Sequence, residues 1–158
     1  MLRIGLGRDL HRLVPGRRFL LGGVEIPFDK GELGHSDGDV LAHAVIDALL
    51  GAAGIGDIGE LFPPDDPAYK DADSLVLLGS ARRRLEGWRL VNLDCVVCCE
   101  GPKILPYREK IRQSLAKALE VDPALVFIKG KTNEGIGPIG LGEAVEATAV
   151  CLIEKTDE

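Results

Sequence analysis

The sequence predicts an α+β fold: a single mixed β-sheet whose helices pack on one face. Two observations indicate this class. The chain has 158 residues, enough for one domain with a substantial core. Segments with strand and helix periodicity alternate in the order βββ-α-α-β-α-β-β. Because no repeat, low-complexity tract or linker interrupts them, we expect residues 1–158 to form a single domain.

Each expected element has its own signal. Gly22-Gly23 joins two apolar runs, which favours a hairpin, and the clearest helix begins with acidic residues and ends at a glycine. A loop as long as 54–73 is usually functional. In order, we expect a strand at 3–13, the hairpin at 17–28, a loop at 29–39, the helix at 37–54, the loop at 54–73, a helix at 74–87, a strand at 89–101, a helix at 107–121, a strand at 124–133, a glycine-rich loop at 134–144 and a strand at 144–155.

The composition argues against several classes of protein. A net charge of −6 is unlike that of a general nucleic-acid binder. The N-terminus lacks the apolar region of a signal peptide, and no apolar run approaches the ~20 residues of a membrane span. The four cysteines fit a reducing compartment. We therefore expect a cytoplasmic protein with no membrane or nucleic-acid partner.

Cys95 and Cys98 have the spacing of a zinc motif. They lie in an apolar, β-branched segment that is typical of a strand, where their side chains would point to opposite faces. Cys95 and Cys99 would lie ~13 Å apart at ~3.3 Å per residue. Neither pair can bind one ion, so we interpret these residues, with Cys151, as buried thiols.

Asp9, His11 and His43 are candidate metal ligands. Asp9 and His11 lie two apart in a predicted strand and therefore share a face. One carboxylate and two imidazoles suit zinc and leave a fourth position open, although His43 alone could be a core histidine. Asp39 and Asp47 lie one turn before and after His43 and are candidates to orient its ring.

Three groups of residues offer contacts to an anionic, hydroxylated ligand. His35 and Ser36 precede a helix and can donate to an anion, although Ser36 or Asp37 could instead be an ordinary helix cap. Asp57, Asp65 and Asp66 can accept from hydroxyl groups or simply form a solvated acidic loop.

The third group lies at the end of the strand predicted at 124–133, where Lys129, Lys131, Thr132 and Glu134 can contact phosphate oxygens and a bound Mg²⁺. Gly135, Gly137 and Gly140 match a dinucleotide-binding pattern, but the chain ends 18 residues after Gly140. No room remains for the helix, strand and acidic residue that a Rossmann unit needs.

The segments GRDLHRL, GGVEIPFDKGELGHSDGDVLAHAVIDALLGAAGIGDIGELFP, GPKILP and KTNEG resemble, in order and spacing, the 2-C-methyl-D-erythritol 2,4-cyclodiphosphate synthase family of the non-mevalonate isoprenoid route. The resemblance covers essentially the whole chain. It implies a homotrimer with active sites between subunits. It also implies a phosphorus–oxygen lyase that converts 4-diphosphocytidyl-2-C-methyl-D-erythritol 2-phosphate to the cyclic diphosphate and releases CMP.

The resemblance also implies roles for individual residues. Asp9, His11 and His43 would bind Zn²⁺, Glu134 would bind Mg²⁺ or Mn²⁺ with the diphosphate, and His35 and Thr132 would stabilise the transition state. The implied substrate contacts are Asp9, Leu10, His11, His35, Ser36, Asp57, Ile58, Gly59, Phe62, Pro63, Pro64, Asp65, Asp66, Cys99, Glu100, Gly101, Pro102, Lys103, Ile104, Leu105, Lys131, Thr132, Asn133 and Glu134.

The chain departs from the family pattern at Pro138 and Leu141, which stand where an aromatic residue and an arginine are usual. Our hypothesis is that Lys131 restores the lost positive charge. Two other functions remain open from the sequence: a metal-dependent phosphoesterase that uses water as nucleophile, and a non-catalytic trimeric module that a metal stabilises.

Overall fold

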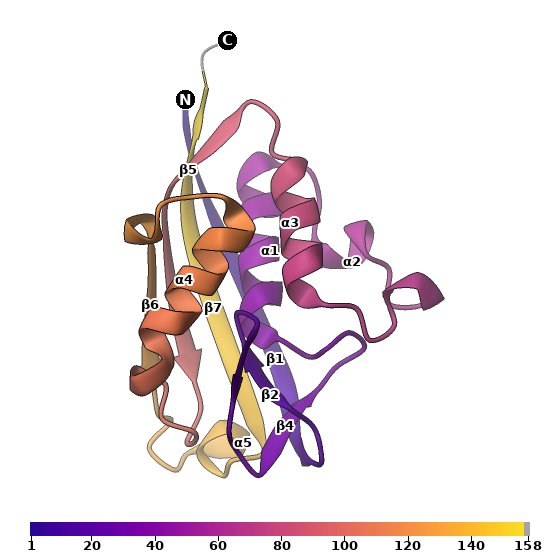
Figure 1. Cartoon of the computed structure of the whole chain (residues 1–158), viewed down its shortest axis with the longest axis vertical. Helices are drawn as coiled ribbons and strands as arrows, with labels where there is room; N and C mark the ends of the chain where they lie inside the picture. The colour runs from indigo at the N-terminus through magenta and orange to yellow at the C-terminus, as the bar shows by residue number, and fades with distance from the viewer. Residues whose placement is uncertain (157–158) are drawn as a thin grey trace.

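The computed structural model describes residues 1–156 and is built on a five-stranded sheet (Figure 1). Its strand order is β4-β1-β7-β5-β6. Only β5 and β6 run parallel, so the sheet is mixed, as predicted. The strands are β1 (Leu2–Pro15), β4 (Lys30–Leu33), β5 (Trp88–Cys98), β6 (Val126–Lys131) and β7 (Ala144–Lys155).

The three main helices are α1 (Val40–Ala53), α3 (Ser74–Arg83) and α4 (Arg108–Leu119). Helix α1 packs on β1 and β7, α4 packs on β6, and α3 packs against both helices (Figure 1). Asp39 caps the start of α1, and Gly54 ends it in the left-handed conformation, so the predicted helix signals are confirmed. Within residues 1–156 no helix is long and apolar enough to cross a membrane.

The two faces of the sheet differ. On β7 the inward side chains, from Val145 to Ile153 at every second position, are buried beneath the helices. On β1 the outward face is exposed and largely apolar, with Ile4 73% and Leu6 66% exposed, although Arg8 and Arg12 share this face. Helices therefore cover one face, as predicted, and the opposite face presents apolar side chains to the surface.

Four details of the predicted element map were wrong. The predicted hairpin forms, as β2 (Phe19–Leu21) and β3 (Val24–Ile26), but it makes a separate two-stranded sheet. The expected loop at 29–39 contains β4, which extends the main sheet beside β1. The expected loops at 54–73 and 134–144 contain single helical turns, α2 (Ile58–Leu61) and α5 (Gly137–Gly140). These pieces of four residues or fewer are too short to show a periodic pattern.

The expected opposite orientation of Cys95 and Cys98 is confirmed, but the expected burial is wrong for Cys98. Cys95, Cys99 and Cys151 are buried on the inner side, whereas Cys98 is half-buried and lies on the other face of β5. All four are free thiols. Burial raises the pKa of Cys99 to about 12, so this thiol is inert at neutral pH.

Candidate active site

Asp9, His11 and His43 converge at the contact between β1 and α1. Oδ2 of Asp9 lies 2.9 Å from Nε2 of His11 and 3.0 Å from Nδ1 of His43. The candidate ligand atoms of the three residues all lie within 4.8 Å of one another. Two imidazoles and one carboxylate at this separation fit the donor set of a zinc site with an open position.

The opposite ring nitrogens of both histidines also have partners. Nδ1 of His11 lies 2.6 Å from the carbonyl oxygen of Gly38, which can only accept a hydrogen bond. Nε2 of His43 lies 2.9 Å from the hydroxyl oxygens of Ser36 and Ser74. When these nitrogens carry the protons, Nε2 of His11 and Nδ1 of His43 keep their lone pairs for a metal.

The prediction that Asp39 and Asp47 orient His43 was wrong. The Asp39 carboxylate accepts from the backbone N–H groups of Gly22, Gly23 and Ala42, and it thereby joins the hairpin turn to the start of α1. Asp47 accepts from the N–H of Ile58 at 2.8 Å and fixes α2. Both carboxylates bind nearby backbone donors, and neither is hydrogen-bonded to the imidazole.

The electrostatics of the three candidate ligands favour an ionised carboxylate. Burial raises the pKa of Asp9, but hydrogen bonds and charge from His11 and His43 outweigh burial and bring it well below its usual range. Burial lowers the pKa of His11, but the adjacent Asp9 raises it overall. Asp9 thus stays negative, as a metal-binding carboxylate must.

A hollow of about 250 Å³ opens above these three side chains. Besides the three candidate ligands, six of the predicted contact residues line it: His35, Ser36, Ile58, Gly59, Phe62 and Pro64. Tyr69 and Leu77 also line it and were not predicted from the sequence. Tyr69 packs edge-on against Phe62, with ring centroids 5.3 Å apart, and closes one wall.

Other predicted contacts do not line this hollow. Leu10 lies on the exposed face of the sheet, since it alternates with Asp9 and His11 along β1. Asp57 and Asp66 cap the short helical turns that follow them, by accepting from the N–H groups of Glu60 and Ala68. Pro63 and Asp65 belong to the same loop but are not part of the wall.

A second hollow, of about 290 Å³, lies between the end of β6 and the start of α4. Eight predicted contact residues line it: Cys99, Glu100, Pro102, Lys103, Ile104, Leu105, Lys131 and Thr132. Arg108 and Gly130 complete it and were not predicted. The guanidinium of Arg108 lies over the ring of Phe127 at 5.1 Å, and a Cβ on Gly130 would lie 3.0 Å from Ile104.

The loop after β6 is fixed by two carboxylates. Oε1 of Glu100 accepts from the N–H groups of Asn133, at 2.8 Å, and Gly135, at 3.2 Å. The hydroxyl of Thr132 donates to Glu134 at 2.8 Å. The loop that carries Thr132 and Glu134 is therefore tied to the segment that begins at Cys99. Gly101, Asn133 and Glu134 adjoin this hollow in sequence but do not line it.

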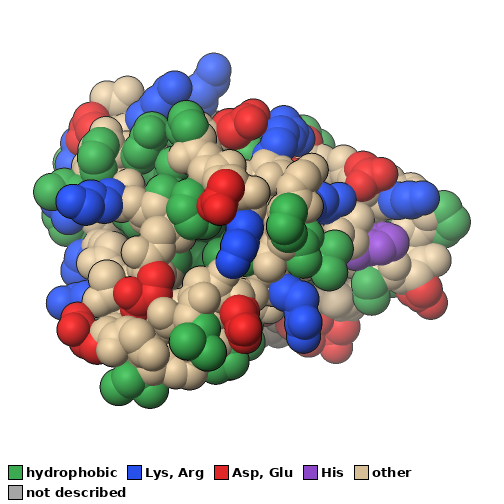
Figure 2. Space-filling model, turned by 90° about the horizontal axis from the view of Figure 1, so that it is seen from below, with side chains coloured by type: hydrophobic (Ala, Val, Ile, Leu, Met, Phe, Trp, Pro, Cys, Tyr) green, Lys and Arg blue, Asp and Glu red, His purple; other side chains and the backbone are tan. Residues whose placement is uncertain are grey.

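The two hollows lie towards opposite edges of the sheet. Asp9 and His11 are on β1, Thr132 follows β6, and three strand-to-strand steps separate them, roughly 14 Å at ~4.8 Å per step. Figure 2 shows the end of the molecule below the sheet, where basic side chains are interspersed with acidic and apolar ones. No single-sign surface dominates this view, so an anion would depend on local donors.

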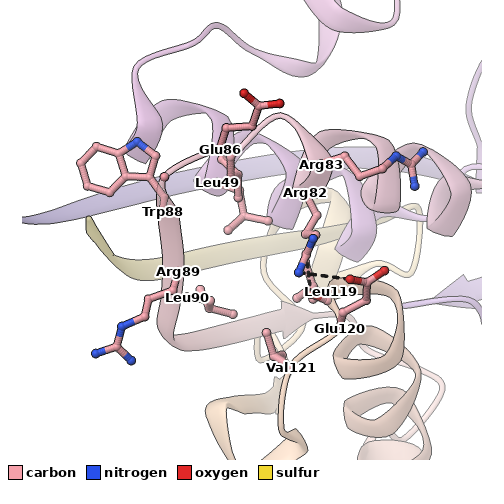
Figure 3. Close-up of a pocket in the computed structure, with 12 residues that line it drawn as sticks. Leu49, Arg82, Arg83, Glu86, Trp88, Arg89, Leu90, Leu119, Glu120 and Val121 are labelled. Atoms are coloured by element: carbon pink, nitrogen blue, oxygen red, sulfur yellow. Dashed lines mark hydrogen bonds and ion pairs between the residues drawn. The ribbon is translucent and has the colours of Figure 1, made fainter. Parts of the chain in front are cut away.

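A third hollow, of about 380 Å³, lies between the C-terminal ends of α3 and α4 and the start of β5 (Figure 3). None of the predicted residues line it. Arg82 donates to the carbonyl oxygen of Leu119 at 3.1 Å and pairs with Glu120 at 3.1 Å. Arg82 therefore caps the C-terminal end of α4. This contact is structural, and the first two hollows, which contain most of the predicted residues, form the candidate site.

Comparisons with known proteins bear on the candidate site. The model of the YgbB family matches residues 2–154. The 2-C-methyl-D-erythritol 2,4-cyclodiphosphate synthase of Treponema denticola is 58% identical over 154 residues, with 96% of each chain covered. That of Chloroherpeton thalassium is 54% identical over 156 residues, with 98% of this chain and 99% of the relative covered.

Solved structures show the same fold. The bifunctional IspDF of Campylobacter jejuni superposes with a TM-score of 0.96 and 37% identity over 99% of this chain, which corresponds to 43% of that longer protein. The CDP complex of IspF from Plasmodium falciparum superposes with a TM-score of 0.87 and 34% identity, covering 99% of this chain and 97% of the other.

Proposed function

The chain belongs to the family of 2-C-methyl-D-erythritol 2,4-cyclodiphosphate synthases, enzymes of the non-mevalonate route to isoprenoids, and we propose that its first two hollows together form the active site. The observation that carries this proposal is the convergence of Asp9, His11 and His43 beside His35 and Ser36. The hollow above the three ligands would take the phosphorylated sugar, and the hollow beside β6 would take the cytidine. The substrate is then 4-diphosphocytidyl-2-C-methyl-D-erythritol 2-phosphate.

The metals are assigned from the chemistry of the donors. Asp9, His11 and His43 would hold Zn²⁺, and Glu134 would hold Mg²⁺ or Mn²⁺. When bound, these ions supply positive charge that stabilises phosphate oxygens in the transition state. An acidic protein with a net charge of −6 can thus act on an anionic substrate.

The residues of the chain would position a substrate that carries its own nucleophile. The 2-phosphate oxygen attacks the β-phosphorus, the bond from that phosphorus to the bridging oxygen breaks, and CMP leaves with this oxygen. The attacking phosphate is already anionic at neutral pH, so no general base is needed. Catalysis then comes from in-line positioning and charge stabilisation, with His35 and Thr132 stabilising the transition state.

The remaining contacts divide between the two parts of the substrate. Ser36, with the loop residues Asp57–Gly59 and Phe62–Asp66, would contact the methylerythritol and its phosphate. Cys99–Leu105 would bind the cytosine, mainly through backbone groups, and Lys131–Glu134 would lie over the diphosphate. The hydrogen bonds that fix these loops support this division, because they hold the backbone donors in place before the substrate binds.

We infer that the enzyme is a homotrimer with active sites between its subunits. Ile4, Leu6 and Leu10 are exposed on the face of the sheet that no helix covers, and such an apolar surface is typical of an interface. Each site would be completed when the hollow above Asp9, His11 and His43 of one subunit lies beside the β6 hollow of its neighbour. Size measurement by light scattering tests this, and Leu6→Asp should yield monomers.

Three broader assignments accompany this proposal. The reaction forms a cyclic diphosphate by expelling CMP without water, which makes the enzyme a phosphorus–oxygen lyase. Residues 1–158 act as one catalytic domain, in keeping with a single connected core. Four free thiols support the cytoplasmic location predicted from the sequence.

The decisive experiment is to incubate the purified protein with the cytidylyl substrate and identify the products by phosphorus NMR. CMP and the cyclic diphosphate in equal amounts support the proposal, whereas linear products would indicate a phosphoesterase. His43→Ala should remain folded but inactive. Glu86→Ala, which changes the third hollow, should keep full activity.

A further inference from the structure

We propose that Ser74 and Asp37 position His43, by fixing which of its ring nitrogens carries the proton. Neither residue is among the predicted site residues. Ser74 is the first residue of α3, is completely buried, and lies 31 positions after His43 in the sequence. This inference rests on the proposed function, because it concerns the metal site of Asp9, His11 and His43.

Asp37 is held in place by backbone donors. Its carboxylate accepts from the backbone N–H of Ser74 at 3.0 Å and from that of Asp39 at 3.1 Å, so its position is fixed at both oxygens. The hydroxyl of Ser74 also donates to Oδ1 of Asp37. A hydroxyl has one proton, and a carboxylate can only accept, so the proton of Ser74 is committed to Asp37.

The direction of the next hydrogen bond follows from this. The oxygen of Ser74 lies 2.9 Å from Nε2 of His43 and, with its proton engaged, can only accept. Nε2 of His43 must therefore carry the proton of that bond. Nδ1, on the side of Asp9, is left with the lone pair that binds a metal.

Ser36 is the matched comparison within the same site. Its hydroxyl oxygen also lies 2.9 Å from Nε2 of His43. Its other neighbours are the hydroxyl of Ser74 at 3.4 Å and the N–H of Gly38 at 3.5 Å, and within residues 1–156 it is hydrogen-bonded to no carboxylate. The proton of Ser36 is thus free to turn, and Ser36 does not determine the tautomer of His43.

The same loop then supports both imidazoles. Gly38 accepts from His11 through its carbonyl oxygen, and Asp37 acts on His43 through Ser74. Residues 35–39 would therefore bind the phosphate with His35 and Ser36 and orient the zinc ligands with Asp37 and Gly38. Mutation of a residue that hydrogen-bonds to a metal-binding imidazole typically lowers metal affinity by about 10- to 100-fold.

The test is zinc affinity, measured by competition with a chromogenic chelator in the absence of substrate. Ser74→Ala should bind zinc about 10- to 100-fold more weakly than the wild type, whereas Ser36→Ala should change affinity only slightly. Equal affinity of Ser74→Ala and wild type would overturn the inference, as would equal losses in both variants. If the wild-type protein binds no zinc, or His43→Ala binds it unchanged, the proposed metal site itself fails.

A second test uses NMR of the wild-type protein and therefore does not require that the Ser74→Ala variant folds. In the zinc-loaded wild-type protein, the Nε2 proton of His43 should appear in proton–nitrogen NMR spectra and exchange slowly with water, because its acceptor is completely buried. Fast exchange of this proton would contradict a fixed bond to Ser74. In Ser74→Ala the resonance should shift and exchange faster.

Discussion

A β-carbon on Gly7 would lie 1.9 Å from the carbonyl oxygen of Ala44, so β1 and α1 touch backbone to backbone. Gly5 has the same relationship with Ala48, at 1.8 Å. Gly5, Gly7, Asp9 and His11 occupy alternate positions on one face of β1, and His43 directly precedes Ala44. The two glycines therefore set the distance at which the strand and helix ligands meet.

Replacing Gly7 with alanine should weaken both stability and zinc binding. The new methyl group would collide with backbone, which cannot rotate away, and α1 would have to move outward. We expect Gly7→Ala to lower the free energy of unfolding by at least about 1 kcal/mol, because overpacking typically costs about 1–3 kcal/mol. Urea denaturation of the metal-free protein and a zinc titration of the folded variant measure the two effects.

Gly51 provides the control within α1. A β-carbon there would meet no atom within 4 Å. Gly51→Ala should therefore stabilise the protein by up to about 1 kcal/mol, since alanine is the better helix former, and leave zinc affinity unchanged. Equal losses of stability in both variants would show that the close contact between Gly7 and Ala44 is not the cause of the loss in Gly7→Ala.

The sequence was sufficient for the long elements and for the choice of three candidate metal ligands, whose ligand atoms lie within 4.8 Å of one another. Asp9 and His11 share a strand face, and the apolar pattern around His43 indicates a helix. Their meeting was expected only from the family resemblance, although a local signal existed: the small residues Gly5 and Gly7 match Ala44, Ala48 and Ala52 on α1. Paired small residues on a strand and a helix indicate close packing of the two.

The partners of His43 could not be found from spacing. Asp39 and Asp47 lie one helical turn away, but carboxylates near the end of a helix or beside a loop bind the free backbone N–H groups first. Ser74 comes from another helix and reaches His43 only because α3 packs against α1. Tertiary packing, not local sequence, selects this partner.

Asp39 should therefore matter for stability more than for metal binding. Asp39→Ala leaves the N–H groups of Gly22, Gly23 and Ala42 without their acceptor in a buried place. At about 1–3 kcal/mol for each unsatisfied donor, the loss should reach about 3 kcal/mol. Zinc affinity of the folded protein should fall much less than in Ser74→Ala.

Asp73 is the matched capping residue for this comparison. It caps α3 by accepting from the N–H of Leu75, a bond that is exposed to solvent. Asp73→Ala should cost only about 1 kcal/mol, the usual value for a lost cap. Thermal denaturation of both variants gives the comparison, and a loss in Asp39→Ala no larger than this would refute the role of Asp39 at the hairpin.

Glu32 should make stability fall as pH rises. It is completely buried, Oε2 accepts from the N–H of Leu20, and Oε1 has no hydrogen-bond partner among residues 1–156. Burial, followed by the charge of Asp39, raises its pKa well above the ordinary value of 4.5. The folded state therefore holds a proton that the unfolded chain releases, and stability falls as pH rises from about 4.5 towards the folded pKa.

Glu32→Gln removes this dependence, because the amide cannot ionise. The variant should match the wild type in stability at about pH 4 and exceed it at about pH 8, as urea denaturation at both pH values would measure. Glu25→Gln, an exposed position on β3, should change stability by less than about 0.5 kcal/mol at either pH. A constant difference between Glu32→Gln and wild type at both pH values would contradict the buried proton.

Glu100 should control nucleotide binding through the loop after β6. Both of its bonds, to the N–H groups of Asn133 and Gly135, use the same oxygen, Oε1. Glu100→Ala releases the loop that carries Thr132. Affinity for CDP, measured by calorimetry, should fall by about 10-fold, which corresponds to one hydrogen bond to a charged group.

Glu100→Gln separates positioning from charge. Its carbonyl oxygen can accept both N–H groups, so the loop should stay in place and CDP affinity should remain near that of the wild type. Glu109→Ala, on the exposed side of α4, controls for the loss of a carboxylate elsewhere. If Glu100→Gln loses as much affinity as Glu100→Ala, the negative charge matters and not the hydrogen bonds.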